Sequence, residues 1–203
     1  MMTDSPIAAR VLSPSDYRRM PWKNGGGLTT EIVVVPPDAN FDAFAWRVSM
    51  ADVDESGPFS TLADIERVLV LTAGNGMRLT GDGTTLDVTQ PYEPVRFAGE
   101  RPLHCVLRSG PVRDFNLMVR RGVARGDVHV VRRDAQTMPP ADAYLVHAVR
   151  GAYECHIAGS AMVGLAVEHS LVVEPFGAGS APQLALHAQS ADAVALVAAI
   201  QWL

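Results

Sequence analysis

The sequence predicts an all-β protein built from two small β-units, and three observations support this. Apolar and polar residues alternate with a period of two in many segments, as in strands with one buried face. About a dozen such segments occur, separated at short intervals by 14 prolines and 17 glycines. The balance of charge also changes midway along the chain. Many short strands with frequent turns are typical of a sandwich or barrel, and there are more here than one eight-stranded barrel needs.

The strands can be placed from this alternation. In residues 43–51, aromatic and aliphatic side chains alternate with Arg47 and Ser49. The Asp82-Gly83 pair predicts a tight hairpin between strands at 77–80 and 84–88. Further strands are expected at 29–35, 65–72, 103–107, 113–121, 127–133, 143–149, 153–158, 162–167, 171–174, 184–187 and 194–200. One short helix is expected at 13–19, with Ser13 as N-cap and Pro14 in the first helical position.

The change in charge predicts where the two units meet. Residues 1–133 contain 16 basic and 16 acidic side chains, whereas residues 134–203 contain one basic and six acidic side chains. The segment QTMPP at 136–140 has the composition of a linker. We therefore expect a first unit over about residues 1–135 and a second, smaller unit over about residues 136–203.

Composition limits the class of protein. The 203 residues are 48% hydrophobic and 19% charged, with a net charge of −5. This excludes a disordered chain and a nucleic-acid binder that works through general basicity. No apolar run approaches the roughly 20 residues of a membrane span, and the N-terminus lacks the apolar segment of a secretory signal. Cys105 and Cys155 form no CxxC motif, so we expect two buried thiols in a soluble cytoplasmic protein without membrane or nucleic-acid partners.

The most unusual segment is MPWKNGGGLTTE at residues 20–31. It contains Lys23, the only lysine in a chain with 16 arginines, and the planar guanidinium of arginine does not replace a compact ammonium. Three consecutive glycines suit a backbone with positive φ or a close approach to a ligand, and consecutive N–H groups can hold an anion. The alternative is a tight turn into the next strand with Trp22 in the core. A phosphate-binding loop is excluded because GxxxxGK[ST] is absent.

Two predicted strands carry polar side chains on one face. These are Arg47 and Ser49 on one strand, and Asp114, Asn116 and Arg120 on the other. Such a face is solvent-exposed in many sheets, but it lines a ligand cavity where it faces the inside of a barrel. Arg67 points either into such a cavity or to the surface.

Known catalytic and metal-binding patterns are absent. The six histidines form no HxH, HxxxH or HExxH, and no GxSxG is present. Nothing in the residues therefore requires an enzyme.

Four segments in order resemble the HutD/Ves family of bacterial proteins. They are MPWKNGGGLTTEI at 20–32, FAWRVSMADV at 44–53, GPFSTLADIERVLVLTAGNGMRL at 57–79 and GPVRDFNLMVRRG at 110–122. The resemblance covers about residues 8–125. It implies a bicupin, with two cupin-like (double-stranded β-helix) barrels packed in one chain, and an association with histidine utilisation. The family brings no established reaction.

The resemblance also bears on metal binding. Cupins commonly hold a metal through GxxxxxHxHxxxxE, whereas the comparable stretch after Gly57, PFSTLADIERVL, has no histidine. We therefore expect neither a metal nor another cofactor.

From these observations we expect a metal-free cupin-type protein that binds a small carboxylate and supports or regulates histidine utilisation. The expected ligand-binding residues are Trp22, Lys23, Asn24, Gly25, Glu31, Arg47, Ser49, Arg67, Asp114, Asn116 and Arg120. Lys23 and Arg47 would hold the carboxylate, because charge-assisted hydrogen bonds are strong. The histidine-pathway intermediates urocanate, formiminoglutamate and formylglutamate are the candidate ligands.

Two other functions stay open. The first is a metal-independent cupin enzyme (an isomerase, lyase or hydrolase) acting on a small organic acid, with Glu31 or Asp114 as general base and Lys23 stabilising negative charge. The second is a protein-interaction role. The apolar C-terminal segment AVALVAAIQWL at 193–203 is either a core strand or a contact in a homodimer.

Overall fold

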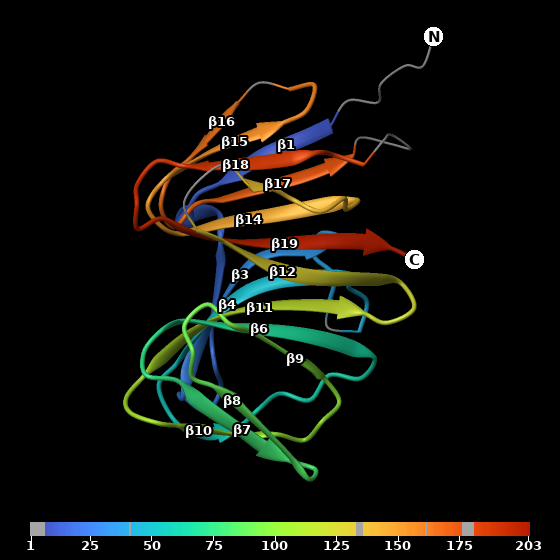
Figure 1. The fold of residues 1–203 in the computed structure, drawn as a ribbon. Coiled ribbons are helices and arrows are strands. Elements are labelled where there is room, and N and C mark those ends of the chain that lie inside the picture. The colour runs from blue at the N-terminus through green and yellow to red at the C-terminus, as the bar shows by residue number, and fades with distance from the viewer. Residues whose placement is uncertain (1–6, 41, 133–135, 161, 176–180) are drawn as a thin grey trace. The chain divides into compact units, whose positions relative to one another are not determined.

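The computed structural model describes residues 7–40, 42–132, 136–160, 162–175 and 181–203. Within these ranges the chain is almost entirely β-structure, with one 3-10 helix, η1 (Pro14–Asp16). The chain divides into two compact units (Figure 1). One unit runs from Tyr17 to Arg125, and the other combines strand β1 (Ile7–Leu12) with the chain from Gly126 to Trp202. The all-β prediction is confirmed.

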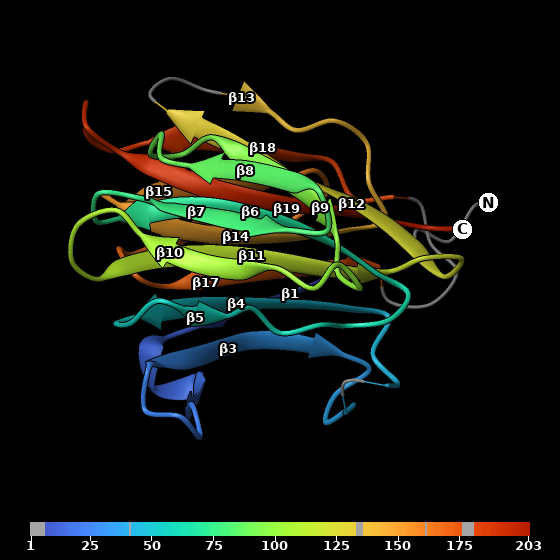
Figure 2. The same cartoon turned by 90° about the horizontal axis from the view of Figure 1, so that it is seen from below.

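The Tyr17–Arg125 unit consists of two antiparallel sheets. The larger sheet has the order β2 (Arg18–Pro21), β3 (Gly27–Val35), β4 (Trp46–Val53), β11 (Val112–Arg120), β6 (Ile65–Ala73) and β9 (Pro94–Ala98). The smaller has the order β5 (Gly57–Pro58), β10 (His104–Leu107), β7 (Met77–Gly81) and β8 (Thr84–Val88). Figure 2 shows β3 and β4 next to each other within the larger sheet. The sheets do not close into one continuous barrel.

A hydrophobic core lies between these two sheets. Leu69 and Leu71 of β6 pack there with Met77 and Leu79 of β7, and all four side chains are fully buried. Cys105 of β10 belongs to the same cluster, as the sequence predicted for a buried thiol. On the opposite face of the larger sheet, the central strands β4, β6 and β11 carry a second set of buried apolar side chains, namely Trp46, Val48, Val68, Val70, Phe115 and Leu117.

The second unit has the same two-sheet plan. Its larger sheet has the order β1, β17 (Ser170–Pro175), β14 (Ala143–Arg150), β19 (Val194–Trp202) and β12 (Ala124–Arg132). Its smaller sheet has the order β13 (Gln136–Thr137), β18 (Leu184–Ala188), β15 (Tyr153–Ile157) and β16 (Val163–Leu165). The apolar C-terminal segment forms β19, an interior strand that is buried from Val194 to Ile200. The core-strand interpretation therefore holds as far as Ile200, whereas Trp202 and Leu203 are exposed.

The predicted hairpin is present, and its backbone explains its sequence. Asp82 and Gly83 have φ angles of 49° and 67°, and Gly81 pairs with Thr84 across the turn. Two positive φ angles match the right-handed twist of the flanking strands, which is why Asp-Gly is favoured there.

The predicted helix at 13–19 is shorter than expected. Ser13 precedes it as predicted, but its hydroxyl does not accept from the first turn; instead the Asp16 carboxylate accepts from the Ser13 amide at 2.8 Å and from the Ser13 hydroxyl at 2.7 Å, and the Asp16 amide donates to the Ser13 carbonyl at 2.9 Å. Strand β2 begins at Arg18, opposite Glu31 of β3, so the chain leaves the helix after one turn. Sheet pairing therefore overrides local helix propensity. Strands β1, β2, β5, β9 and β13 were not predicted.

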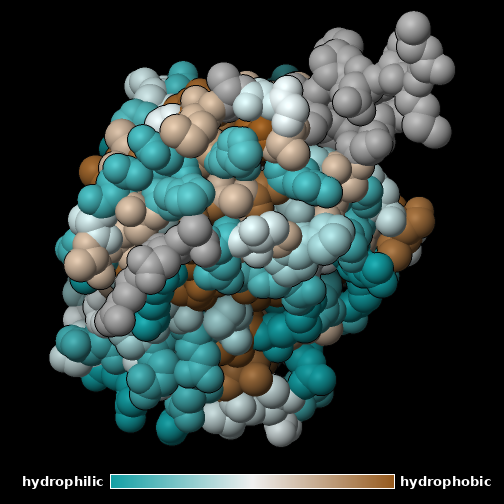
Figure 3. Space-filling model, turned by 45° about the horizontal axis from the view of Figure 1, so that its top comes forward, coloured by the Kyte–Doolittle hydropathy of each residue, from teal (hydrophilic) through white to brown (hydrophobic). Residues whose placement is uncertain are grey.

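The face in Figure 3 is mostly hydrophilic, with hydrophobic residues confined to small areas. In the described ranges, no helix is long and apolar enough to cross a membrane.

Candidate ligand-binding site

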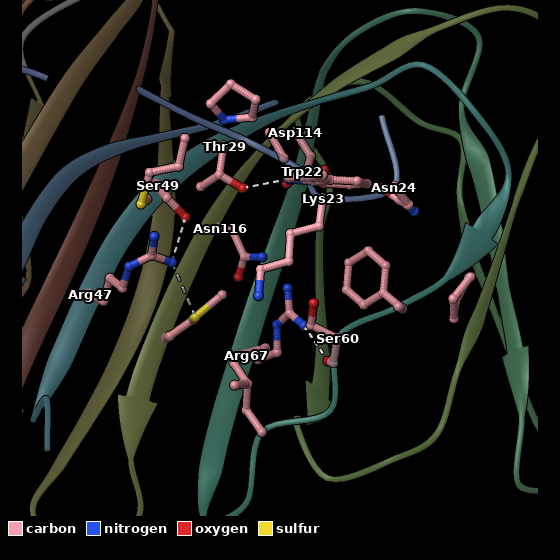
Figure 4. Close-up of a pocket in the computed structure, with 17 residues that line it drawn as sticks. Trp22, Lys23, Asn24, Thr29, Arg47, Ser49, Ser60, Arg67, Asp114 and Asn116 are labelled. Carbon is pink, nitrogen blue, oxygen red and sulfur yellow. Dashed lines mark hydrogen bonds between the residues drawn. The ribbon is translucent and has the colours of Figure 1, made fainter. Parts of the chain in front are cut away.

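A cavity of about 510 Å³ lies within the Tyr17–Arg125 unit. Its wall is formed by the turn between β2 and β3, by one face of the larger sheet, and by the segment after β5 (Figure 4). The lining residues are Met20, Pro21, Trp22, Lys23, Asn24, Thr29, Arg47, Ser49, Ala51, Pro58, Phe59, Ser60, Leu62, Arg67, Asp114, Asn116 and Met118. A cavity of this size accommodates a small metabolite.

Strand register brings the polar side chains together. Asn116 of β11 lies opposite Ser49 of β4, and Met118 lies between Arg47 on β4 and Arg67 on β6. Alternate residues of each strand point to the same side. The polar faces predicted for β4 and β11 are therefore one continuous surface, and that surface lines the cavity.

The triple glycine shapes the turn above this surface. Gly25 has a φ of 75°, in the left-handed region that favours glycine. A Cβ atom on Gly27 would lie 2.4 Å from the Asp52 carbonyl oxygen and 3.0 Å from the Trp22 ring. The amides of Gly25 and Gly26 donate within the turn, to Trp22 O at 3.0 Å and to the Asn24 side chain at 3.2 Å. These two amides are thus used by the turn itself, and the expected anion-binding role of the glycine backbone has no support.

Trp22 is fixed at the mouth of the cavity. Its indole Nε1 donates to Thr29 Oγ1 at 2.8 Å, and its ring packs against the core between the sheets. Lys23 follows on the exposed side of the turn, and its side chain extends into the cavity. In Figure 4 the Lys23 amine points toward Asn116 and Arg67. The turn therefore supplies an ammonium that solvent and a bound ligand can both reach.

Arg47 is held rigidly in the wall. Only 3% of it is exposed, and its Nε donates to Glu31 Oε2 at 2.6 Å. Its Nη1 donates to Ser49 Oγ at 3.3 Å and contacts Met118 Sδ at 3.8 Å. Glu31 thus orients the guanidinium and compensates its charge from the neighbouring strand, as expected for a buried cation.

Arg67 is a second buried guanidinium, 3% exposed. Its Nη1 donates to the Ser60 carbonyl at 3.2 Å, and the group lies 4.4 Å from the centre of the Phe59 ring and 5.2 Å from that of Phe97. Burial lowers the pKa of Arg67 to about 10, against the opposing influence of the Asp114 carboxylate. Arg67 therefore stays protonated at neutral pH, stabilised by two aromatic faces.

Asp114 is fully buried in the wall, and neither carboxyl oxygen has a hydrogen-bond partner. Burial raises its pKa to about 7, while Arg67 works in the opposite direction and Asp52 adds to the rise. Asn116, 4% exposed on the same strand face, also has a buried Oδ1 without a partner. Both protonation states of Asp114 are therefore populated near neutral pH, because the interior penalises the charged form.

Eight of the eleven predicted residues line the cavity: Trp22, Lys23, Asn24, Arg47, Ser49, Arg67, Asp114 and Asn116. Three predicted residues do not. Glu31 pairs with Arg47 from the adjacent strand β3, and Gly25 belongs to the turn. Arg120 donates from Nε to the Phe44 carbonyl at 2.9 Å, with its guanidinium 5.5 Å from the centre of the Phe44 ring.

Sequence reasoning missed the segment after β5. Pro58, the last residue of β5, lines the cavity together with Phe59, Ser60 and Leu62, which belong to no strand or helix. The only available signal was that this stretch lies in one of the segments that carry the family resemblance. Phe59 stacks on Arg67, so this segment also stabilises one of the cations.

The wall does not suit a metal ion. It contains no histidine and a single carboxylate, Asp114, beside three cationic side chains. Among the residues described, no three His, Cys, Asp or Glu side chains cluster as metal ligands would. The cupin metals need several imidazole or carboxylate donors, so the donor set of this cavity does not fit one.

Relatives and solved structures resemble this chain. An uncharacterised 21.2 kDa protein in the hutC 3′ region of Pseudomonas putida is 45% identical over 109 residues, which cover 54% of this chain and 57% of that protein. Protein Ves of Cronobacter sakazakii is 35% identical over 143 residues, which cover 68% of this chain and 77% of that protein. The structure of HutD from Pseudomonas fluorescens SBW25, described under a formate condition, has a TM-score of 0.79 at 32% identity and covers 97% of this chain and 100% of its own.

More distant structures show the fold class. Protein YlbA of Escherichia coli has a TM-score of 0.68 at 9% identity and covers 98% of this chain and 93% of its own. An oxalate decarboxylase of Bacillus subtilis has a TM-score of 0.64 at 9% identity and covers 98% of this chain and 78% of its own. These likenesses support the predicted cupin-type fold. The sequence model of HutD matches residues 14–196, so the chain belongs to the HutD family and has a cupin-type fold.

Proposed function

We propose that this protein binds a small organic carboxylate in the cavity of the Tyr17–Arg125 unit. The observation behind this proposal is the convergence of three cationic side chains, Lys23, Arg47 and Arg67, from three separate segments on one cavity. Two of them are almost completely buried, where a charge-assisted hydrogen bond to an anion is stronger than in water. The wall offers only one carboxyl group, Asp114, so the cavity favours negative charge.

The ligand belongs to histidine utilisation in this proposal, because the chain belongs to the HutD family. Urocanate, formiminoglutamate and formylglutamate are small acids that a cavity of about 510 Å³ can hold. Binding one of them lowers its free concentration in the cell. A protein with this property damps induction of the pathway when the intermediate accumulates.

A thermal-shift titration with these three acids tests the proposal. A ligand that binds only the folded state stabilises it by RT ln(1 + [L]/Kd), or about 2.7 kcal/mol at a concentration 100 times Kd. The wild-type protein should show a concentration-dependent rise in Tm with at least one acid, and Lys23→Ala should reduce that rise. Lys23 is exposed, so this variant is expected to fold.

The matched control is Arg78→Ala, since Arg78 is also an exposed cation of this unit but pairs with Asp87 away from the cavity. It should leave the ligand-induced shift unchanged. Arg47 is best tested as the double variant Arg47→Gln with Glu31→Gln, which removes both charges of the buried pair together. The absence of a shift with all three acids, or equal shifts in wild type and Lys23→Ala, would refute the proposal.

A second function, metal-independent catalysis on the same class of acid, is favoured by Asp114. A buried carboxyl with a pKa of about 7 is suited to exchange protons at neutral pH. Glu31 is less suited, because it is committed to Arg47 at 2.6 Å. Mass spectrometry of the acids after incubation separates the two functions. Unaltered acid retained in stoichiometric amounts supports binding, whereas a product that disappears with Asp114→Asn supports catalysis.

A further inference from the structure

Asp114, in the wall of the cavity, is a buried carboxyl group that lacks hydrogen-bond donors. Its side chain is fully buried and its two carboxyl oxygens have no hydrogen-bond partner. Buried polar groups in native proteins are almost always hydrogen-bonded, and an unpartnered one is costly. The neighbouring strands offer no side-chain donor, because Ala51 of β4 and Leu71 of β6 lie directly opposite Asp114.

The charged groups around Asp114 do not donate a hydrogen bond to it either. Arg67 is close enough to influence its pKa, but the contacts that position the Arg67 guanidinium are the Ser60 carbonyl and two aromatic rings. Asp52 and the Cys105 thiol are also within electrostatic range, and neither donates a hydrogen bond to Asp114. The groups around the Asp114 carboxyl therefore attract or repel its charge, but none of them donates a hydrogen bond to its oxygens.

A second unpartnered acceptor lies beside the first. Asn116 is two residues further along β11, on the same face, and its Oδ1 is buried without a partner. Both residues line the cavity, as do the three cations. The cavity thus combines a cationic part with hydrogen-bond acceptors, and a ligand that satisfies both needs two different chemical groups.

We propose that the carboxylate ligand also carries a nitrogen with an N–H group, and that this N–H donates a hydrogen bond to Asp114. This inference rests on the carboxylate binding proposed above. The ligand class is then acids with an amide, amidine or imidazole N–H, rather than plain mono- or dicarboxylates. In this arrangement Lys23 and Arg47 hold the carboxylate, and Asp114 selects the ligand by its N–H. Urocanate, formiminoglutamate and formylglutamate all carry such a group.

Selectivity follows from what a ligand without the N–H leaves behind. Its carboxylate would still meet Lys23 and Arg47, but the buried carboxyl of Asp114 would stay unpartnered beside a new negative charge. Sites built around a ligand N–H reject analogues that lack it, because a buried polar group of the protein then has no partner. The cationic residues therefore supply affinity for acids in general, and Asp114 distinguishes among acids.

Isothermal titration calorimetry with three probes tests this inference. The probes are N-formyl-L-glutamate, the isosteric ester in which oxygen replaces its N–H, and glutarate. At about pH 8, where Asp114 is ionised, the wild-type protein should bind the amide about tenfold to about a hundredfold more tightly than the ester, the range expected for one hydrogen bond to a charged acceptor. Glutarate should bind no better than the ester.

Variants assign this preference to Asp114. Asp114→Ala should reduce the amide-to-ester affinity ratio to near one, and Asp114→Asn, which keeps the shape and a neutral acceptor, should reduce it to a few-fold. Asp52→Ala is the matched control, because Asp52 is an aspartate on the adjacent strand that pairs with Arg113 at 2.6 Å and does not line the cavity. It should leave the ratio unchanged.

The outcomes separate this inference from the function on which it rests. Equal affinity of the wild type for the amide and the ester, with both weakened by Lys23→Ala, would overturn the role of Asp114 and leave carboxylate binding standing. A preference for the amide that persists in a folded Asp114→Ala variant would do the same. Failure of the wild type to bind any of the three probes would overturn both.

Discussion

Replacing Asp114 by asparagine is expected to stabilise the protein, and increasingly so as the pH rises. Asparagine keeps the size of the side chain but removes the buried charge that has no hydrogen-bond partner. In the unfolded chain Asp114 titrates near the ordinary value of 3.8, whereas burial raises its pKa to about 7 in the folded protein. The folded state thus binds more protons than the unfolded state between these two values, and wild-type stability falls as the pH rises through that window.

The size of the effect follows from the separation of the two pKa values. A difference of one pKa unit corresponds to about 1.4 kcal/mol, so the full penalty above pH 7 is about 4 kcal/mol. Because the unfolded-state carboxyl is already ionised at pH 5, the part that develops between pH 5 and pH 8 is about 3 kcal/mol. Asp114→Asn should therefore gain about 3 kcal/mol of stability relative to wild type across this range.

Urea unfolding followed by tryptophan fluorescence, at several pH values from 5 to 8, measures this difference directly. The control is Asp87→Asn, because Asp87 is an exposed carboxyl whose pKa is lowered by its hydrogen bond to Arg78. Stability from such a group is lost only as the pH falls through its folded-state pKa, so the difference between this variant and wild type should be flat from pH 5 to 8. An equally flat difference for Asp114→Asn would refute the reasoning, since the buried carboxylate would then carry no penalty.

Three further predictions concern the turn beside the cavity, the buried ion pair and the buried cysteines. Gly27→Ala should lower the free energy of unfolding in urea by at least about 2 kcal/mol, because the added Cβ would lie 2.4 Å from a carbonyl oxygen of β4. Gly25→Asn should lower it by less than about 1 kcal/mol, because φ at Gly25 is 75° and no atom lies within 4 Å of the added Cβ. Glu31→Gln should lower the free energy of unfolding by about 2–3 kcal/mol, because it removes the carboxylate that lies 2.6 Å from the buried Arg47 guanidinium. If the double variant Glu31→Gln with Arg47→Gln regains the lost stability, the unpaired charge of Arg47 is the cause. Burial raises the pKa of the Cys105 thiol to about 11, and both cysteines are buried. A thiol reagent at about pH 8 should therefore leave Cys105 and Cys155 unmodified until urea unfolds the chain. Rapid labelling of the native protein would contradict this prediction.

Most strands could be placed from the sequence because each depends on a local pattern. Alternation of apolar and polar residues marked strands such as β4 and β11, and the Asp82-Gly83 pair marked the hairpin between β7 and β8. The missed strands had no such pattern. Strand β2 reads as the end of a short helix, and it becomes a strand only because β3, further along the chain, offers pairing partners. That information is not local, so periodicity does not contain it.

Part of the site was also determined locally. Alternation alone places Arg47 and Ser49 on one face of β4, and Asp114 and Asn116 on one face of β11. The unusual composition around Lys23 marked the turn as special. In contrast, Arg120 belongs to the same predicted face of its strand but contacts Phe44, at the end of the sheet and away from the lining of the cavity.

The sequence by itself determined which side chains share a strand face, because that follows from the two-residue repeat of an extended backbone. Only the tertiary structure decided that the faces of β4, β6 and β11 are adjacent, and that the turn between β2 and β3 and the segment around Phe59 close over them. That covering keeps water from Arg47, Arg67 and Asp114, and loss of water is what raises the pKa of a carboxyl group and strengthens a cation's attraction for an anion. The chemistry of the site therefore depends on burial, which arises from contacts between residues far apart in the chain.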